Sequence, residues 1–309
     1  MKKIISNIYD KILPNAKNIR LIFPENDDRI KQAKIKLKKI GFNIVDLDDC
    51  KGHQDDFFNS AKKLKFSKNW PDDKLQEYLD LPLNQGINIV RAGLADALIA
   101  GASLPTSDLA RSSLRFIGLN NKSNCLSSSF IMVSPNENRL FFYADCAIVP
   151  EPSESQLADI AYDTAESYSQ LTGDTPKVAF LSFSTDSSAS HYRVSKVKRA
   201  IDIFGSKYPN ILHEKTELQF DAAICSDISK KKYSKSVLKG EANVLIYPNL
   251  DAGNIAYKIT QRLGGYSAVG PLLQGLNKPI HDLSRGCSVN DIVDISIISA
   301  YQGMMNADI

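Results

Sequence analysis

The 309-residue sequence lacks the long apolar segments that mark membrane proteins and secreted precursors. No stretch approaches the roughly 18 apolar residues that a membrane-spanning helix needs. The short apolar stretch near the N-terminus is interrupted by Asn7, Asp10 and Lys11, so it lacks the apolar centre of a signal peptide. We therefore expect a cytoplasmic protein with no membrane partner.

Neither sign of charge dominates the sequence. Lys and Arg together number 38 and Asp and Glu 35, which gives a net charge of +3. A nucleic-acid-binding domain usually carries a marked basic excess, so this balance disfavours nucleic acid as a partner. It is compatible with a local basic pocket for a polyanionic small molecule.

Cysteine and histidine patterns for metal or disulfide sites are also missing. The five cysteines are scattered and form no C-x-x-C pair, and the four histidines show no ligand spacing. Such a pattern fits neither a disulfide framework nor a zinc site, so we expect a reducing cytosol and no bound metal or cofactor. The sequence also contains no G-x-x-x-x-G-K-[ST], H-E-x-x-H or G-x-S-x-G motif.

What is present is an alternation of apolar strands and amphipathic helices. This order predicts an α/β fold with mostly parallel sheets covered on both faces. The polar stretch 51–85 predicts short helices or a mobile insertion, and the proline-rich corner 149–153 predicts a hinge. Strands are predicted at 18–24, 43–47, 95–101, 128–133, 140–145, 177–183 and 242–247, and helices at 27–40, 106–117, 153–173, 193–204 and 251–263.

Four predicted strands end in polar or glycine-rich loops, at residues 101–106, 145–150, 182–190 and 282–291. Ligands of α/β folds bind at the carboxyl ends of strands, so these loops are candidate sites. In the last loop Arg285 stands between hydroxyl residues just before a helix, which suits an anion. Ser288 and Asp291 also fit a helix capping box, and on spacing alone this structural interpretation is the better supported.

The other candidate residues each have a structural alternative. The loop 182–190 has the hydroxyl groups to cradle a phosphate, but a surface Ser/Thr loop has the same composition. Arg111 and Arg115 lie one helical turn apart and could grip a phosphate or simply form a solvated face. Cys146 follows a strand, as a nucleophile would, although a buried structural cysteine is more usual.

Several long segments of the sequence form an ordered set of motifs. They are 218–227 (LQFDAAICSD), 242–265 (ANVLIYPNLDAGNIAYKITQRLGG) and 269–294 (VGPLLQGLNKPIHDLSRGCSVNDIVD), with shorter motifs at 23–29 (FPENDDR), 95–101, 130–132, 144–147 and 178–185. With these motifs the sequence resembles the phosphate acetyl/butyryltransferase family, and within it the phosphotransacetylases. The resemblance covers roughly residues 95–294, with the further match at 23–29.

This resemblance implies two three-layer α/β domains with the active site in the cleft between them. The expected domains are residues 1–143 with 284–309, and residues 144–283. The implied reaction is reversible acetyl transfer between acetyl-CoA and phosphate, through a ternary complex, as part of acetate metabolism. Coenzyme A would be a substrate and not a bound cofactor, and the family habit is a homodimer.

The resemblance also implies roles for individual residues. Asp291 matches the proposed general base on the CoA thiol, whose ordinary pKa is about 8.5. Arg285 matches the arginine that binds the phosphoryl group, and Ser284 the serine that hydrogen-bonds the reacting carbonyl or phosphate. Arg111 matches a further anion ligand. The other residues expected to bind substrate or CoA are Ser182, Ser184, Thr185, Cys146 and Asn254.

The sequence departs from the family pattern at other positions, among them residues 62–65 (KKLK), where the family has a stretch with an arginine. Leu104 replaces a histidine, Val149 an asparagine, Asp186 a basic residue and Ser187 a glycine. Two alternatives to an acetyltransferase therefore stay open. One is a sibling enzyme for propionyl or butyryl groups, and the other is a catalytically silent module that binds acetyl-CoA or acetyl phosphate.

Overall fold

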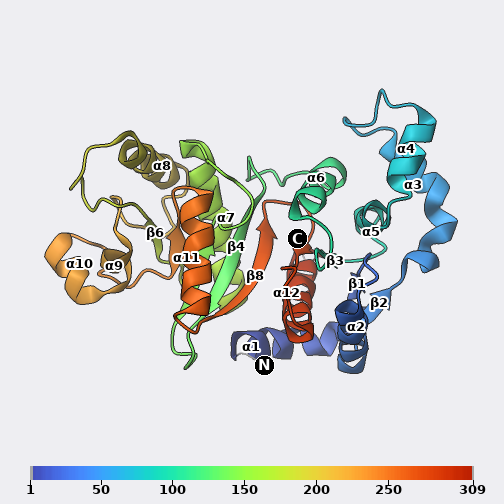
Figure 1. Ribbon diagram of the computed structural model, residues 1–309, viewed down its shortest axis with the longest axis horizontal. Helices are drawn as coiled ribbons and strands as arrows, with labels where there is room; N and C mark the ends of the chain where they lie inside the picture. Colours follow the sequence, from blue (N-terminus) through green and yellow to red (C-terminus); the bar gives the residue numbers. More distant parts are fainter. Residues whose placement is uncertain (1–2, 308–309) are drawn as a thin grey trace. The chain divides into compact units, whose positions relative to one another are not determined.

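The structure is a computed structural model that describes residues 3–307 (Figure 1). The chain divides into two compact units, here called the first unit (Met1–Asn120 with Leu276–Ile309) and the second unit (Asn121–Gly275). These boundaries differ from the expected 143/144 and 283/284. The hairpin of residues 127–144 belongs to the sheet of the second unit, and residues 280–282 pair with the sheet of the first unit.

A four-stranded sheet in the order β2–β1–β3–β9 is the core of the first unit. All three pairings are parallel, so the carboxyl ends of the strands share one edge. Ala100 is paired with Asp282, which brings the loop after residue 282 beside the loop after residue 100. The strands are β1 (Arg20–Ile22), β2 (Asn43–Val45), β3 (Ala97–Ala100) and β9 (Ile280–Asp282).

Helices cover this sheet. Helix α12 packs on β3 and α2, and α5 packs on β3 and α6. The predicted helix 27–40 is confirmed with both ends, since Asp27 caps α2 and Gly41 ends it at φ +112°. The helices are α1 (Lys3–Ile12), η1 (Leu13–Asn18), α2 (Asp28–Ile40), η2 (Leu47–His53), α3 (Gln54–Ala61), α4 (Asp72–Leu79), α5 (Pro82–Arg91), α6 (Thr106–Phe116) and α12 (Val289–Ala307).

The second unit contains a five-stranded sheet in the order β6–β7–β5–β4–β8. Strands β6, β7 and β5 run parallel, whereas β4 is antiparallel to both β5 and β8. The predicted α/β architecture with mostly parallel sheets is thus confirmed. The strands are β4 (Ser127–Val133), β5 (Leu140–Ala144), β6 (Val178–Phe180), β7 (Val244–Ile246) and β8 (Ser267–Gln274).

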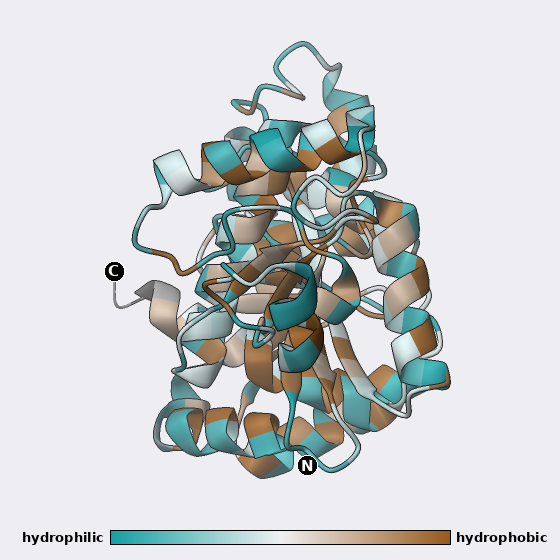
Figure 2. Ribbon diagram, turned by 90° about the vertical axis from the view of Figure 1, so that its left-hand side faces the viewer, coloured by the Kyte–Doolittle hydropathy of each residue, from teal (hydrophilic) through white to brown (hydrophobic). Residues whose placement is uncertain are grey.

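Two helices cover opposite faces of this sheet. Phe142 of β5 contacts Tyr168 of α7, whereas Phe141 and Tyr143 lie in a core cluster with Tyr257 of α11. Successive residues of a strand point to opposite faces, so α7 and α11 flank the sheet (Figure 1). Helices are striped brown and teal in Figure 2, as expected where one face is buried. The helices are α7 (Glu154–Thr172), α8 (Tyr192–Lys207), α9 (Phe220–Ile224), α10 (Ser226–Lys232) and α11 (Leu250–Arg262).

The proline-rich corner 149–153 leads directly into α7. Ser153 and Gln156 form a capping box, and Gly173 ends the helix in the left-handed conformation, as predicted. The corner lies inside the second unit, so its interpretation as a hinge between units is wrong.

Candidate active site

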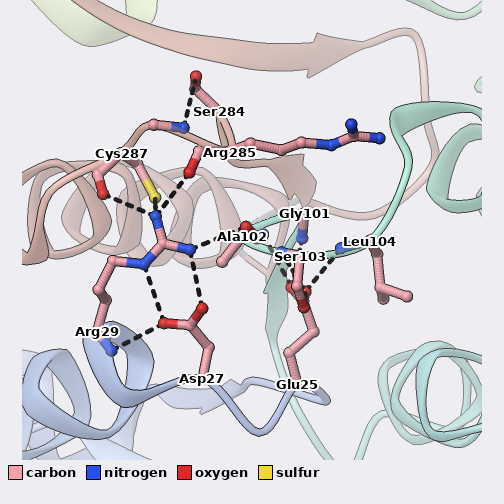
Figure 3. Close-up of polar contacts among 11 residues, drawn as sticks. Glu25, Asp27, Arg29, Gly101, Ala102, Ser103, Leu104, Ser284, Arg285 and Cys287 are labelled. Carbon is pink, nitrogen blue, oxygen red and sulfur yellow. Dashed lines mark hydrogen bonds and ion pairs between the residues drawn. The ribbon is translucent and has the colours of Figure 1, made fainter.

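Three loops meet at the carboxyl edge of the first unit's sheet. They comprise residues 23–27, 101–105 and 283–288 and follow β1, β3 and β9. Because these strands are parallel neighbours, the loops lie side by side (Figure 3). This edge is where α/β folds bind ligands.

The loop after β9 exposes two predicted site residues, Ser284 and Arg285. The hydroxyl of Ser284 accepts a hydrogen bond from Gly286 N at 3.4 Å. The guanidinium of Arg285 extends away from the loop, with no contact to the other residues drawn in Figure 3. A guanidinium presents five donors in a planar fork, so this side chain is placed to bind a phosphate or carboxylate.

Asp291 lies in the first turn of α12 and completes the predicted capping box. Its Oδ2 accepts hydrogen bonds from Ser288 N at 2.9 Å and from Ser288 Oγ at 2.8 Å, and Asp291 N donates to Ser288 Oγ at 3.2 Å. The capping interpretation is therefore confirmed. Within residues 3–307 no hydrogen bond reaches Oδ1, so one oxygen of this half-buried carboxylate is still available to a ligand.

Glu25 fills a ring of backbone donors in the loop after β3. Its Oε2 accepts from Gly101 N at 2.5 Å and Ala102 N at 3.1 Å. Its Oε1 accepts from Ser103 N at 2.8 Å, Ser103 Oγ at 2.6 Å and Leu104 N at 3.0 Å. Converging N–H groups of this kind favour an anion, and here the chain's own carboxylate supplies it (Figure 3).

Asp282 is buried beneath the same loop. Its Oδ2 accepts a hydrogen bond from Thr106 Oγ1 at 2.5 Å, while Oδ1 has no partner among the described residues. Burial raises the pKa of Asp282 to about 6, although the hydrogen bond from Thr106 opposes this shift. Thr106 is the first residue of α6, whose N-cap is Pro105 and has no side-chain cap.

A cavity of about 490 Å³ lies beside these loops in the first unit. This volume is in the range of small-molecule sites, which is about 300–1,000 Å³. Arg111 lines it, and its guanidinium pairs with Asp108 at 2.9 Å. Arg115 instead donates to the hydroxyl of Tyr78 at 3.0 Å, so the two guanidinium groups have different partners and do not form one phosphate-binding pair. The lining residues are Pro24, Glu25, Asn26, Tyr78, Leu81, Pro82, Leu83, Asn84, Ser103, Leu104, Asp108, Arg111 and Ser112.

Three predicted binding residues lie in the loop after β6 of the second unit. The buried Ser184 donates to Glu217 Oε1 at 2.7 Å, and Ser182 Oγ accepts from Ser184 N at 3.2 Å. Thr185 Oγ1 accepts from Gln219 N at 2.9 Å. Burial acts to raise the pKa of Glu217, but hydrogen bonds such as that from Ser184 outweigh it and the pKa is lowered. These hydroxyls are therefore engaged in holding the loop together.

Cys146 and Asn254 join the loop after β5 to α11. Cys146 is fully buried, and burial raises the pKa of its thiol well above the usual range. This supports the structural interpretation of Cys146 over the nucleophile. Asn254 Nδ2 donates to Cys146 O at 2.9 Å, so its amide also serves the fold.

The departures from the family pattern fall where backbone groups make the contacts. Leu104 N donates to Glu25, and Val149 N donates to Asp145 Oδ2 at 2.6 Å, so neither contact depends on the side chain. Asp186 and Ser187 have φ values of +48° and +64°, a conformation that favours glycine. Ser187, which stands where the family pattern has glycine, therefore carries backbone strain.

Within residues 3–307, no helix is long and apolar enough to cross a membrane. No cluster of three or more His, Cys, Asp or Glu side chains suited to a metal ion occurs in that part of the chain.

Sequence reasoning gave no role to Glu25, Arg29 or Asp282. The first two stand in the segment FPENDDR that follows β1. Glu25 lies in the loop after this strand, and Arg29 is a cation in the first turn of a helix. The helix dipole disfavours a cation at that position, which is the signal that could have identified Arg29.

Comparisons with known proteins agree on one family. The sequence profile described as "Phosphate acetyl/butaryl transferase" matches residues 8–300. A phosphate acetyltransferase of Thermoanaerobacterium thermosaccharolyticum is 38% identical, over 97% of this chain and 99% of its own length.

Solved structures give the same result. A phosphotransacetylase from Streptococcus pyogenes is 33% identical and superposes with a TM-score of 0.88, over 98% of both chains. A phosphotransacetylase from Staphylococcus aureus is 34% identical with a TM-score of 0.84, over 97% of this chain and 98% of its own.

Proposed function

Because the chain belongs to the phosphate acetyl/butaryl transferase family and is thus an acyltransferase, we propose that it transfers an acetyl group reversibly between acetyl-CoA and phosphate. The products in one direction are acetyl phosphate and CoA. The relatives named phosphate acetyltransferase support acetyl as the transferred group, and CoA is then a substrate.

In the proposed ternary complex, Asp291 removes the proton from the CoA thiol. The thiolate attacks the carbonyl carbon of acetyl phosphate, a C–S bond forms, and the bond from that carbon to the phosphate oxygen breaks. Phosphate leaves with the electron pair, and the Arg285 guanidinium compensates its charge. Ser284 donates a hydrogen bond to the reacting carbonyl or phosphate, and Arg111 binds a further anionic group.

Asp291 has the atoms for both of its roles. Oδ2 is used by Ser288 in the capping box, so we assign the proton transfer to Oδ1. A thiol with a pKa of about 8.5 is mostly protonated at neutral pH, so a neighbouring carboxylate raises the reactive thiolate fraction.

The observation that carries the proposal is the loop after β9. It exposes the hydroxyl of Ser284 and the guanidinium of Arg285 next to the helix turn that holds Asp291. An anion donor fork, a hydroxyl and a carboxylate within eight consecutive positions supply the groups that acyl transfer from a phosphate to a thiol requires.

The test is CoA-dependent thioester formation from acetyl phosphate, followed by thioester absorbance. Propionyl and butyryl phosphate run alongside rank the acyl chains. Turnover fastest with acetyl phosphate supports the proposal. Binding of acetyl-CoA without turnover, and without arsenate-dependent breakdown of acetyl-CoA, would contradict it and favour a silent binding module.

A further inference from the structure

Arg29 ties two of the site loops together through their backbone. It lies in the first turn of α2, and its Nη1 donates to Arg285 O at 2.7 Å and to Cys287 O at 3.1 Å. Its Nη2 donates to Ala102 O at 2.9 Å. Figure 3 shows the guanidinium between the loop after β3 and the loop after β9.

Asp27 fixes the orientation of this guanidinium. Its Oδ1 accepts from Arg29 Nε at 3.0 Å and its Oδ2 from Arg29 Nη2 at 2.8 Å. The hydrogen bond from Arg29 is the main cause that lowers the pKa of Asp27 to about 2. The pair is therefore ionised throughout the neutral range. Asp27 also caps α2, so the clamp is anchored to the start of a helix.

The donor count of Arg29 separates it from a substrate-binding arginine. A guanidinium has five N–H donors, and the five oxygen acceptors Asp27 Oδ1, Asp27 Oδ2, Arg285 O, Cys287 O and Ala102 O engage them all. No donor is left for a phosphate. Arg285 differs from Arg29 in this respect. Its backbone carbonyl is held by Arg29, whereas its exposed guanidinium extends away from the other residues drawn in Figure 3.

We propose that Arg29 is a positioning residue for Arg285: by holding the carbonyls of Arg285, Cys287 and Ala102, it sets the direction in which the Arg285 guanidinium meets the phosphoryl group. The inference rests on the proposed function of Arg285. Lysine cannot replace Arg29, because an ammonium has three donors on one atom and cannot reach acceptors on two loops and an aspartate at once.

The experiment measures kcat and KM for acetyl phosphate and for CoA in Arg29→Lys, with Arg20→Lys as the matched control. Arg20 forms a similar two-point pair with Asp96 in the same unit, with contacts of 2.6 and 3.2 Å, and touches neither loop. We expect Arg29→Lys to lower kcat by about 10- to 100-fold, because small misplacements of a reacting group have effects of this size. The KM for acetyl phosphate is expected to rise while that for CoA stays within about 2-fold of wild type.

A merely structural role would give a different pattern. If Arg29→Lys lowers stability but its kinetic constants match those of Arg20→Lys, the positioning role is refuted. A second variant, Asp27→Asn, keeps a good helix cap and loosens only the orientation of Arg29, so it should show a smaller loss of kcat in the same direction. Unchanged kcat in both variants overturns the inference, whereas an inactive wild-type protein would instead overturn the proposed function.

Discussion

Replacing Gly101 by alanine is expected to lower the free energy of unfolding by about 2 to 5 kcal/mol. Gly101 has φ +103°, and an L residue in a left-handed conformation costs about 1 to 2 kcal/mol. The new Cβ would overlap Asp282 Oδ1 and lie 2.8 Å from Leu283 N and 3.0 Å from Leu283 O. Overpacking of this kind adds about 1 to 3 kcal/mol, because buried backbone must move to relieve it.

Urea denaturation of Gly101→Ala and Gly93→Ala tests this reasoning. Gly93 has φ +76° but nothing within 4 Å of an added Cβ, so its replacement should show the conformational cost alone. The difference between the two variants measures the close approach of the loops after β3 and β9. Equal losses of stability would refute the claim that these loops are packed too closely for a methyl group.

Three further predictions concern the buried acid, the thiols and the strained loop. Burial raises the pKa of Asp282 to about 6, so ionising this carboxyl costs folding free energy. As the pH rises from 4 to 7, the wild type should lose stability relative to Asp282→Asn by at most about 3 kcal/mol. A stability difference in urea denaturation that does not change with pH would contradict this. Cys225 is the only partly exposed cysteine of the five, so a thiol reagent should modify one group quickly in the native protein; a fast phase that persists in Cys225→Ser would contradict this. Ser187→Gly should raise the free energy of unfolding by about 1 kcal/mol, because it removes a side chain from a residue at φ +64°. A lower free energy of unfolding in this variant would contradict that prediction.

The sequence pattern predicted the elements well where caps and periodicity agreed. Helix α2 is bounded by Asp27 and Gly41, and α7 by Ser153 and Gly173, because these residues satisfy free backbone groups at helix ends. The division into units differs from the expected boundaries in part because a partner of β4 is far away in the chain. Its pairing with β8 joins residues 127–133 to 267–274, which local periodicity does not reveal.

The candidate site was also predictable only where its residues are neighbours in the sequence. The loop of Ser284 and Arg285 is continuous in sequence, so its residues alone predict a candidate anion site. Glu25 and Arg29 act on loops more than 70 residues away, through carbonyl and N–H groups that every residue carries. Only the fold shows which backbone groups these two side chains meet.

The most direct test of the account is the rate of thioester formation by Arg285→Ala, with Arg262→Ala as the charge-matched control on the surface of α11. Loss of a donor that stabilises developing charge lowers kcat by about 100- to 1,000-fold, so Arg285→Ala should fall by this factor with an unchanged melting temperature, while Arg262→Ala keeps wild-type turnover. Wild-type turnover in Arg285→Ala would contradict the assignment of the phosphoryl group to the loop after β9.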